Sequence, residues 1–426
     1  MHLHITMATV HRACPMTALD LSFVRRQFPA FAEPSLQGQA FFENAGGSYA
    51  CSQVIDLLQE YYRRLKVQPG YSYAASGEAG DWMERAHVRL AEYLGVDADE
   101  LHFGPSTSQN TYVLAQAFRG LLRAGDEIVV TNQDHEANTG AWRRLAQDGI
   151  VVREWRVEAD TGALDPAALD ALLCERTRLV VFPHCSNIVA QLNPVARITA
   201  QARSAGALTV VDGVSYAPHG LPDLRALGAD IYLFSLYKTF GPHQGLMALR
   251  RPLLDRLANQ GHYFNAVLPR KRLTPAGPDH AQIAASRGIA EYFDALDAHH
   301  HPGAATAGRP QRVRELLHDA EQPLLARLLD GLEQIPGLRV LGPRDPARRA
   351  ATVAVLPLRQ TPAALVPRLA REGLMTAAGH FYALRLLEAM GVDPAQGVLR
   401  LSFVHYNSAA EIDRLLSGLE QALAAG

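Results

Sequence analysis

Cysteine is scarce in this chain of 426 residues, which contains only four. Cys14, Cys51, Cys174 and Cys185 are scattered and include no Cys-x-x-Cys pair. Neither a disulfide framework nor a zinc site of paired cysteines is therefore indicated. The triplet His299–His301 lies in a setting rich in Gly, Pro and Ala, which is more typical of a flexible loop than of a metal site. The sequence predicts no metal centre.

Long apolar runs and an excess of one charge are also missing. No run approaches the roughly 18 residues of a membrane span, and the start MHLHITMATVHRACP lacks a basic region followed by an apolar core. The formal net charge of −2 gives no reason to expect nucleic acid or an anionic membrane as a partner. With 48% hydrophobic and 20% charged residues, the composition is that of a globular protein. We expect a cytoplasmic location.

The common nucleotide-binding motifs, GxxxxGK[ST] and a strand-linked GxGxxG, are absent, which disfavours nucleotide binding. The segment Gly104-Pro-Ser-Thr-Ser-Gln-Asn110 precedes a helical run, Thr111–Leu122. Free backbone N–H groups and hydroxyls at a helix start suit a phosphate. Any helix N-cap has similar residues, so the motif alone is a weak signal.

Short apolar runs alternate with helical patterns from about residue 100 to residue 250. The runs at 179–182 and 207–211 are continuous, as strands covered on both faces are. Asp165-Pro166 and Asn193-Pro194 are helix starts. This alternation predicts an α/β fold with a largely parallel sheet. The expected strands are Glu127–Thr131, Ile150–Trp155, Leu179–Phe182, Ala207–Val211, Ile231–Phe234 and Leu246–Leu249.

The composition changes at residues 298–310 (AHHHPGAATAGRP), which are predicted to form a linker or loop. Strand-like segments at 338–341, 352–356 and 398–403 follow, with helix starts at Thr361-Pro362 and in the capping box Ser408-x-x-Glu411. We therefore expect a smaller α+β domain. The predicted division is a large domain of residues 36–297 and a small domain of residues 1–35 and 311–426.

Two residues that lie 26 positions apart each follow an apolar run. Asp212 ends the run Leu208–Asp212, and Lys238 lies just past Ile231–Ser235. Pyridoxal-phosphate (PLP) chemistry needs such a pair, because the lysine holds the cofactor as a Schiff base and the acid pairs with the protonated ring nitrogen. The structural alternatives are a turn or helix-cap aspartate and a solvated surface lysine. Their position, where α/β sheets bind ligands, favours the PLP interpretation.

His135 follows the expected strand Glu127–Thr131. A lone loop histidine is more often structural or exposed than catalytic. The functional alternative is an aromatic ring that stacks on the face of the cofactor ring.

With these residues in order, the chain resembles the class V aminotransferase superfamily, in its cysteine desulfurase-like branch, from about Phe41 to the C-terminus. Phe41-Phe-Glu-Asn-Ala-Gly-Gly47 is similar to a segment that lines the substrate site in that branch. The resemblance implies the type I PLP-dependent transferase fold, with a large, mostly parallel mixed-sheet domain and a smaller α+β C-terminal domain. It also implies a PLP cofactor, an L-amino-acid substrate and a homodimer.

The resemblance assigns roles to individual residues. Lys238, Asp212 and His135 are expected to be catalytic. The substrate is expected to contact Asn44, His380, Tyr382 and Arg400, and the arginine is expected to clamp its carboxylate, because its fork of donors suits that group. The expected PLP ligands are Thr107, Ser108, Asn187, Asp212, Ser235, Tyr237 and Lys238.

Three departures from the family pattern matter. Tyr382, in Gly379-His-Phe-Tyr-Ala383, stands where desulfurases carry the cysteine that takes up sulfur. Ser215 replaces a glutamine or histidine close to the cofactor oxygen. Gly277-Pro278 replaces a Gly-Thr pair that contacts the phosphate from the partner subunit, although His280 keeps the histidine that follows.

These features predict an enzyme that forms a carbanion at the substrate Cα. Loss of a β-substituent, protonation at the cofactor or protonation from the opposite face would make it a lyase, an aminotransferase or an epimerase. We favour a carbon–sulfur β-lyase, with an aminotransferase or epimerase as the alternative. A non-catalytic scaffold is the least favoured hypothesis, because Lys238, Asp212, His135 and Arg400 are retained together.

Overall fold

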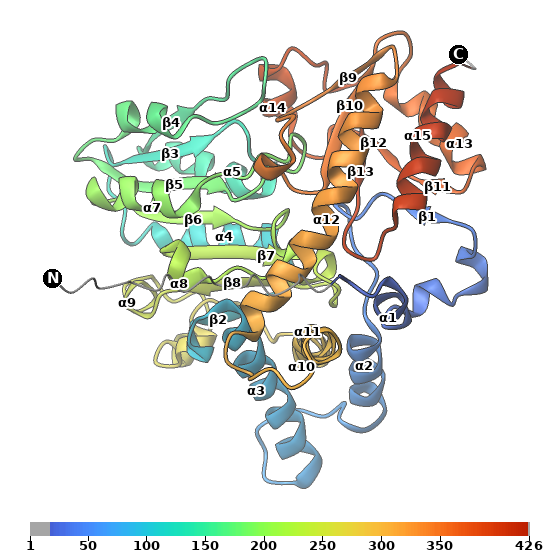
Figure 1. The fold of residues 1–426 in the computed structure, drawn as a ribbon. Coiled ribbons are helices and arrows are strands. Elements are labelled where there is room, and N and C mark those ends of the chain that lie inside the picture. The colour runs from blue at the N-terminus through green and yellow to red at the C-terminus, as the bar shows by residue number, and fades with distance from the viewer. Residues whose placement is uncertain (1–17, 425–426) are drawn as a thin grey trace, which may run out of the picture.

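The computed structural model describes residues 18–424, so Cys14 and the first part of the predicted N-terminal segment lie outside the described residues (Figure 1). Its largest sheet has seven strands in the order β2-β8-β7-β6-β5-β3-β4. Strand β8 is antiparallel to both of its neighbours, and the other pairs are parallel. The strands are β2 (Leu101–Gly104), β3 (Glu127–Thr131), β4 (Val151–Trp155), β5 (Thr177–Pro183), β6 (Leu208–Asp212), β7 (Ile231–Ser235) and β8 (Gly245–Leu249).

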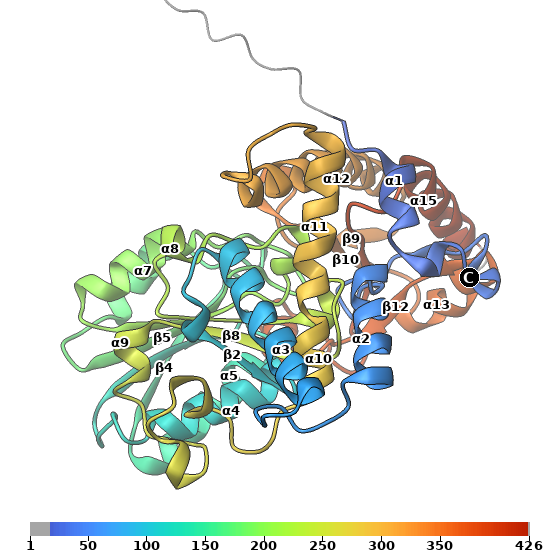
Figure 2. The same ribbon diagram turned by 90° about the horizontal axis from the view of Figure 1, so that it is seen from below.

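The central strands are apolar throughout because both faces of the sheet are covered. Successive side chains of a strand point to opposite faces, so Val180 and Phe182 enter one core and Leu179 and Val181 enter the other. Figure 2 shows α4 and α5 on one side of the sheet and α7 and α8 on the other. The helices up to residue 300 are α1 (Leu21–Arg26), α2 (Ser52–Arg64), α3 (Ala74–Leu94), α4 (Thr107–Phe118), α5 (Glu136–Arg143), α6 (Pro166–Leu169), α7 (Val195–Ser204), α8 (Leu224–Leu227), α9 (Arg251–Leu254), α10 (His280–Ala285) and α11 (Arg287–His300).

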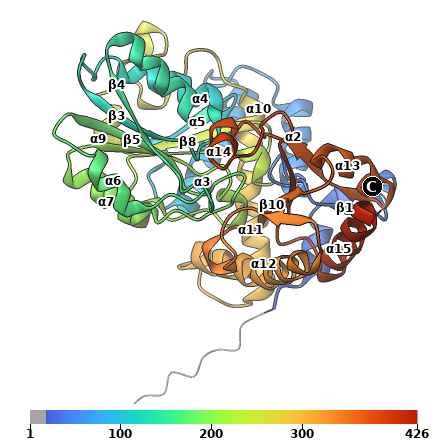
Figure 3. The ribbon, with the colours of Figure 1, turned by 90° about the horizontal axis from the view of Figure 1, so that it is seen from above.

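A second, smaller group of elements lies beside the large sheet (Figure 3). It contains an antiparallel sheet in the order β12-β13-β10-β9 and a parallel pair of β1 with β11. These strands are β1 (Ala40–Phe41), β9 (Leu338–Val340), β10 (Thr352–Pro357), β11 (Leu374–Met375), β12 (Ala377–Gly379) and β13 (Val398–Ser402). The remaining helices are α12 (Arg309–Gln334), α13 (Pro362–Arg371), α14 (Leu384–Ala389) and α15 (Ala409–Ala424).

Helix α12 joins the two parts of the molecule. Its 26 residues carry Val313 and Leu316 into the core beside the large sheet, whereas Leu328 and Leu332 enter the core of the small sheet. The predicted boundary at residue 311 therefore falls inside a helix. The segment between α11 and α12 comprises residues 301–308, which is shorter than the predicted linker at 298–310.

The N-terminal segments also contact both cores. Val24 of α1 packs into the core beside the large sheet, while Arg25 pairs with Glu411 of α15 at 2.6 Å. Ala40 and Phe42 belong to the core of the small sheet, although the predicted division assigned residues 36–297 to the large domain. The division into two domains stays a prediction.

Of the three helix starts predicted from capping residues at Asp165, Asn193 and Ser408, two are confirmed and one is not. The capping box is present, because Ser408 N donates to Glu411 Oε2 and Glu411 N donates to Ser408 Oγ. Asp165 caps α6 as expected. Asn193 does not cap α7, since its amide donates to Gln133 Oε1 and Pro183 O.

The start of one helix and the end of another differ from the sequence prediction. Helix α4 begins at Thr107, four residues before the expected start, so Thr107 and Ser108 lie in its first turn. His299 and His300 form the last turn of α11 and are not in a loop, because His300 is buried against the helix, where its Nδ1 contacts Leu296 O. Between residues 18 and 424 no three His, Cys, Asp or Glu side chains are grouped to hold a metal ion. In the same range no helix combines the length and apolar character of a membrane span.

Candidate active site

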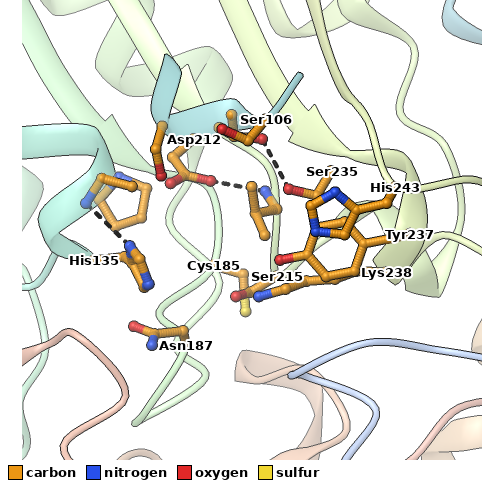
Figure 4. Close-up of a pocket in the computed structure, with 15 residues that line it drawn as sticks. Ser106, His135, Cys185, Asn187, Asp212, Ser215, Ser235, Tyr237, Lys238 and His243 are labelled. Atoms are coloured by element: carbon orange, nitrogen blue, oxygen red, sulfur yellow. Dashed lines mark hydrogen bonds between the residues drawn. The ribbon is translucent and has the colours of Figure 1, made fainter. Parts of the chain in front are cut away.

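A cavity of about 190 Å³ opens at the carboxyl ends of the parallel strands (Figure 4). The strand ends and the turns that follow them supply its lining, because parallel strands end at the same edge of the sheet. The predicted PLP ligands and the predicted catalytic residues meet here. They are Thr107, Ser108, His135, Asn187, Asp212, Ser235, Tyr237 and Lys238, joined by Ser106, Ala137, Pro183, Cys185, Val214, Ser215 and His243.

Lys238 ends a one-turn 3₁₀ helix, Leu236–Lys238, that follows β7 directly. Burial, together with the nearby charge of Arg400, lowers the pKa of Lys238 to about 8, against smaller opposing effects of Asp212 and Glu43. A larger share of this amine is therefore neutral at physiological pH than of an ordinary lysine, as a nucleophilic lysine requires.

Asp212 is the last residue of β6, and in the sheet it pairs with Leu233 of β7. Burial raises the pKa of its carboxyl to about 6, although Val214 N donates to Oδ1 at 2.8 Å and Lys238 lies near. A buried carboxylate gains from a cationic partner. Asp212 is therefore suited to face a protonated ring nitrogen.

His135 caps α5, where its Nδ1 accepts a hydrogen bond from Ala137 N at 3.0 Å. Burial and the charges of Lys238 and Arg400 lower the pKa of His135 to about 3. The ring is therefore neutral at physiological pH, with its proton on Nε2. A neutral ring of this kind can stack on an aromatic cofactor.

The N-terminus of α4 forms one end of the cavity. Ser106 caps the helix by accepting from Gln109 N, and Thr107 Oγ1 lies 2.8 Å from Ser235 Oγ. Backbone N–H groups and hydroxyls at the positive end of a helix suit a phosphate group. Gly245 allows this arrangement, because a Cβ at that residue would lie 2.4 Å from the carbonyl carbon of Ser106.

Asn187 lies in the loop after β5. Its Nδ2 donates to Phe381 O at 2.9 Å, while its Oδ1 is buried without a hydrogen-bond partner among the described residues. An unsatisfied buried polar group is costly. A polar group of a bound ligand would complete this amide.

Arg400 lies on β13 of the small sheet and is buried. Its Nη2 pairs with Glu43 Oε1 at 2.5 Å, and its guanidinium carbon lies 3.8 Å from the centre of the Phe381 ring. Nη1 contacts Asn187 O at 3.4 Å, and Nε has no hydrogen-bond partner among the described residues. Arg400, the predicted substrate clamp, is thus paired with a carboxylate of the protein itself, that of Glu43.

None of the four predicted substrate residues, Arg400 included, is among the residues that line the cavity. The Asn44 amide is engaged within the protein, since Nδ2 donates to Phe41 O and Ser402 O and Tyr406 donates to Oδ1. His380 Nδ1 accepts from Tyr382 N. Tyr382 is 64% exposed, and its ring centre lies 5.2 Å from that of His135. Their substrate roles stay predictions.

The two departures besides Tyr382, at Ser215 and at Gly277-Pro278, lie in different places. Ser215 and Cys185 line the cavity, where burial raises the pKa of the Cys185 thiol to about 12. Pro278 and His280 line a separate groove with residues of α3 and of the segment 262–276.

Four residues at or beside the site were missed by the sequence reasoning. Ser106 and His243 line the cavity, and His243 stacks on Tyr237 with ring centres 4.5 Å apart. Glu43 and Phe381 hold Arg400. Ser106 belongs to the motif identified at 104–110, and Glu43 and Phe381 lie in the segments 41–47 and 379–383 that were compared with the family pattern, whereas His243 had no signal in the sequence.

Comparison with known proteins agrees with this geometry. The model for the Aminotransferase class-V family matches residues 40–273 and 312–415. The aminotransferase-like protein FGM3 of Gibberella zeae is 32% identical over 96% of this chain and 99% of its own length. A cysteine desulfurase of Serratia proteamaculans is 31% identical over 93% of this chain and 97% of its own length. The chain belongs to the class V aminotransferase family.

Solved structures agree on the fold. The apo structure of a cysteine desulfurase from Thermococcus onnurineus has a TM-score of 0.83 at 22% identity, covering 96% of this chain and 99% of that one. A C-DES mutant with glycine covalently linked to its PLP cofactor has a TM-score of 0.74 at 20% identity, covering 93% and 98%. The predictions of the family, the type I fold and a PLP-dependent enzyme are confirmed.

The residues around the cavity fit PLP. The α4 N-terminus with Thr107 and Ser235 would hold its phosphate, and Asp212 would pair with its ring nitrogen. His135 would lie against the ring, and the unpaired Oδ1 of Asn187 would accept a hydrogen bond from a donor of the bound cofactor, such as its phenolic hydroxyl. Lys238 would form the covalent link.

We predict that Gly245→Ala weakens PLP binding about tenfold, measured as the dissociation constant by cofactor fluorescence. The added Cβ would collide with the backbone of Ser106 and Thr107. Overpacking costs about 1–3 kcal/mol, and about 1.4 kcal/mol corresponds to a factor of ten. Gly77→Ala, where a Cβ has no neighbour within 4 Å, is the control. Unchanged affinity in Gly245→Ala would show that the α4 start does not hold the phosphate.

A second prediction concerns the pH dependence of PLP capture by the apoprotein, followed by absorbance. Only the neutral amine of Lys238 reacts, so the capture rate should rise with pH through about 8. Arg400→Gln removes a charge that lowers this pKa and should move the midpoint to higher pH. A midpoint that stays in place, or moves to lower pH, would contradict the coupling of these two residues.

Proposed function

We propose that this enzyme is a carbon–sulfur β-lyase that acts on an L-amino acid of the cysteine type. The main support is the cavity itself, in which Asp212 ends β6 and Lys238 lies just beyond the end of the adjacent strand β7. Relatives of nearly full length that are named cysteine desulfurases support the substrate class.

In the proposed reaction, Asp212, Arg400 and Lys238 have separate roles. PLP, when bound, takes up the electron pair released at the substrate Cα. The carboxylate of Asp212 holds a proton on the ring nitrogen, and Arg400 binds the substrate carboxylate. Lys238 removes the Cα proton, for which its lowered pKa is suited. The β-thiol group then departs as sulfide. Hydrolysis of the remaining unsaturated amino acid gives pyruvate and ammonia.

The fate of the sulfur follows from the absence of an acceptor at residue 382. A tyrosine hydroxyl cannot accept sulfur as a thiolate does. Cys185 is the one cysteine that lines the cavity within the described residues, and burial raises its pKa to about 12, so it is protonated at neutral pH. Sulfide should therefore leave the enzyme.

The enzyme is further proposed to work as a homodimer in the cytoplasm. Large apolar side chains are exposed on two segments beside the groove that contains Pro278, namely Tyr71 and Tyr73 on one and Tyr263, Phe264 and Val267 on the other. Such patches mark protein interaction sites. The three cysteines of the described residues are free, as expected in a reducing compartment.

The product test uses L-cysteine. We predict sulfide, pyruvate and ammonia in equal amounts, and mass spectrometry should find no protein persulfide on residues 379–385. Cys185→Ser should give the same products. Stoichiometric alanine with a +32 Da adduct on Cys185 would instead identify a desulfurase with a relocated nucleophile, and transfer of the amino group to a 2-oxo acid would identify an aminotransferase.

Asp212→Asn should retain PLP but lose Cα deprotonation by about 10²–10³-fold, because a preorganised charge contributes a few kcal/mol to a barrier. The measurement is exchange of the Cα proton with deuterium by NMR. Asp230→Asn is the control, since Asp230 bonds Thr209 at the opposite end of β6. Near-normal exchange in Asp212→Asn would refute the role of this carboxylate.

A further inference from the structure

Arg400 and Glu43 form an ion pair between segments 357 residues apart in the sequence. The Arg400 side chain is 3% exposed and the Glu43 side chain is 23% exposed. A buried guanidinium without a counter-charge is strongly unfavourable. Glu43 therefore stabilises Arg400 when no other carboxylate is present.

The backbone of Glu43 is fixed, while its side chain has an open side. Glu43 bridges to Ser402 of β13, and Asn44 N and Ala45 N donate to Ser402 O and Oγ. The carboxylate of Glu43 folds back over Gly46, whose missing Cβ would lie 1.8 Å from Oε2. Because the Glu43 side chain is partly exposed and the Arg400 side chain is buried, the glutamate is the partner whose side chain can move away.

The other contacts of Arg400 keep the guanidinium in place without Glu43. The Phe381 ring covers one face at 3.8 Å, and Asn187 Nδ2 holds the Phe381 carbonyl. Arg400 Nε is buried and has no hydrogen-bond partner among the described residues. The arginine therefore keeps an unused donor next to the donor that Glu43 occupies, and these two N–H groups can bind one carboxylate bidentately.

We propose that Glu43 is an internal competitor for the substrate carboxylate, which displaces it from Arg400 when the amino acid binds. This inference rests on the carboxylate role of Arg400 in the proposed function. The exchange replaces one carboxylate by another, so the buried guanidinium is never left unpaired. Its consequence is that Glu43 raises the concentration of amino acid needed for saturation and leaves the chemical step unchanged, as loss of uniform binding does.

The test measures propionate binding to the PLP-loaded enzyme by calorimetry. Propionate has the carboxylate and no amino group, so its binding reports on Arg400 without the chemistry at the cofactor. We expect Glu43→Gln to tighten propionate binding about tenfold and to lower KM for the amino acid at unchanged kcat. Glu43→Asp, whose shorter side chain reaches Arg400 less well, should fall between Gln and the wild type.

Two further variants make the result decisive. Glu154→Gln removes a partner of Arg143 at the sheet edge, where the glutamate is 27% exposed, and should leave propionate binding unchanged. Arg400→Gln should abolish it. Arg400→Gln could abolish propionate binding while Glu43→Gln and Glu43→Asp leave it unchanged or weaker. That result would refute competition by Glu43 and would support Arg400 as the carboxylate-binding residue. If Arg400→Gln has no effect, the carboxylate role of Arg400 in the proposed function fails, and the competition fails with it.

Discussion

The site depends on the burial of opposite charges at the ends of strands β6 and β7. Burial lowers the pKa of Lys238 to about 8 and raises that of Asp212 to about 6, so both groups are poised near physiological pH. The sheet makes this possible, because hydrogen bonds between the strands fix where each one ends. The two apolar cores hold the strands, and the charged groups extend into the cavity beyond them.

The second requirement is that the small sheet stays in place against the large one. Arg400 comes from β13, whereas Lys238 and Asp212 come from the large sheet. Helix α12 inserts side chains into both cores, and Phe381 links Arg400 to Asn187. Arg400, the proposed substrate clamp, is therefore positioned by the packing between the two parts as much as by its own strand.

Much of this was predictable from the sequence, because continuous apolar runs of about five residues that alternate with helical segments have a strong pattern. The bounds of β3 were predicted to the residue, and Asp212 and Lys238 were found by their place after such runs. Strands β1, β11 and β12 have two or three residues, too few for any periodicity, and were missed. Glu43 was missed because its partner lies 357 residues away, and no local pattern encodes that distance. The start of α4 was misplaced because its first turn is polar, and its residues read as a loop.

The central claim is that Lys238 carries PLP in this cavity. It is tested most directly by reducing the PLP-loaded enzyme with borohydride, digesting it and mapping the peptides by mass spectrometry. The account predicts a single pyridoxyl adduct, on the peptide that contains Lys238, and none in Lys238→Ala. An adduct on Lys66 or Lys271, the other lysines of the chain, with Lys238 unmodified, would contradict it.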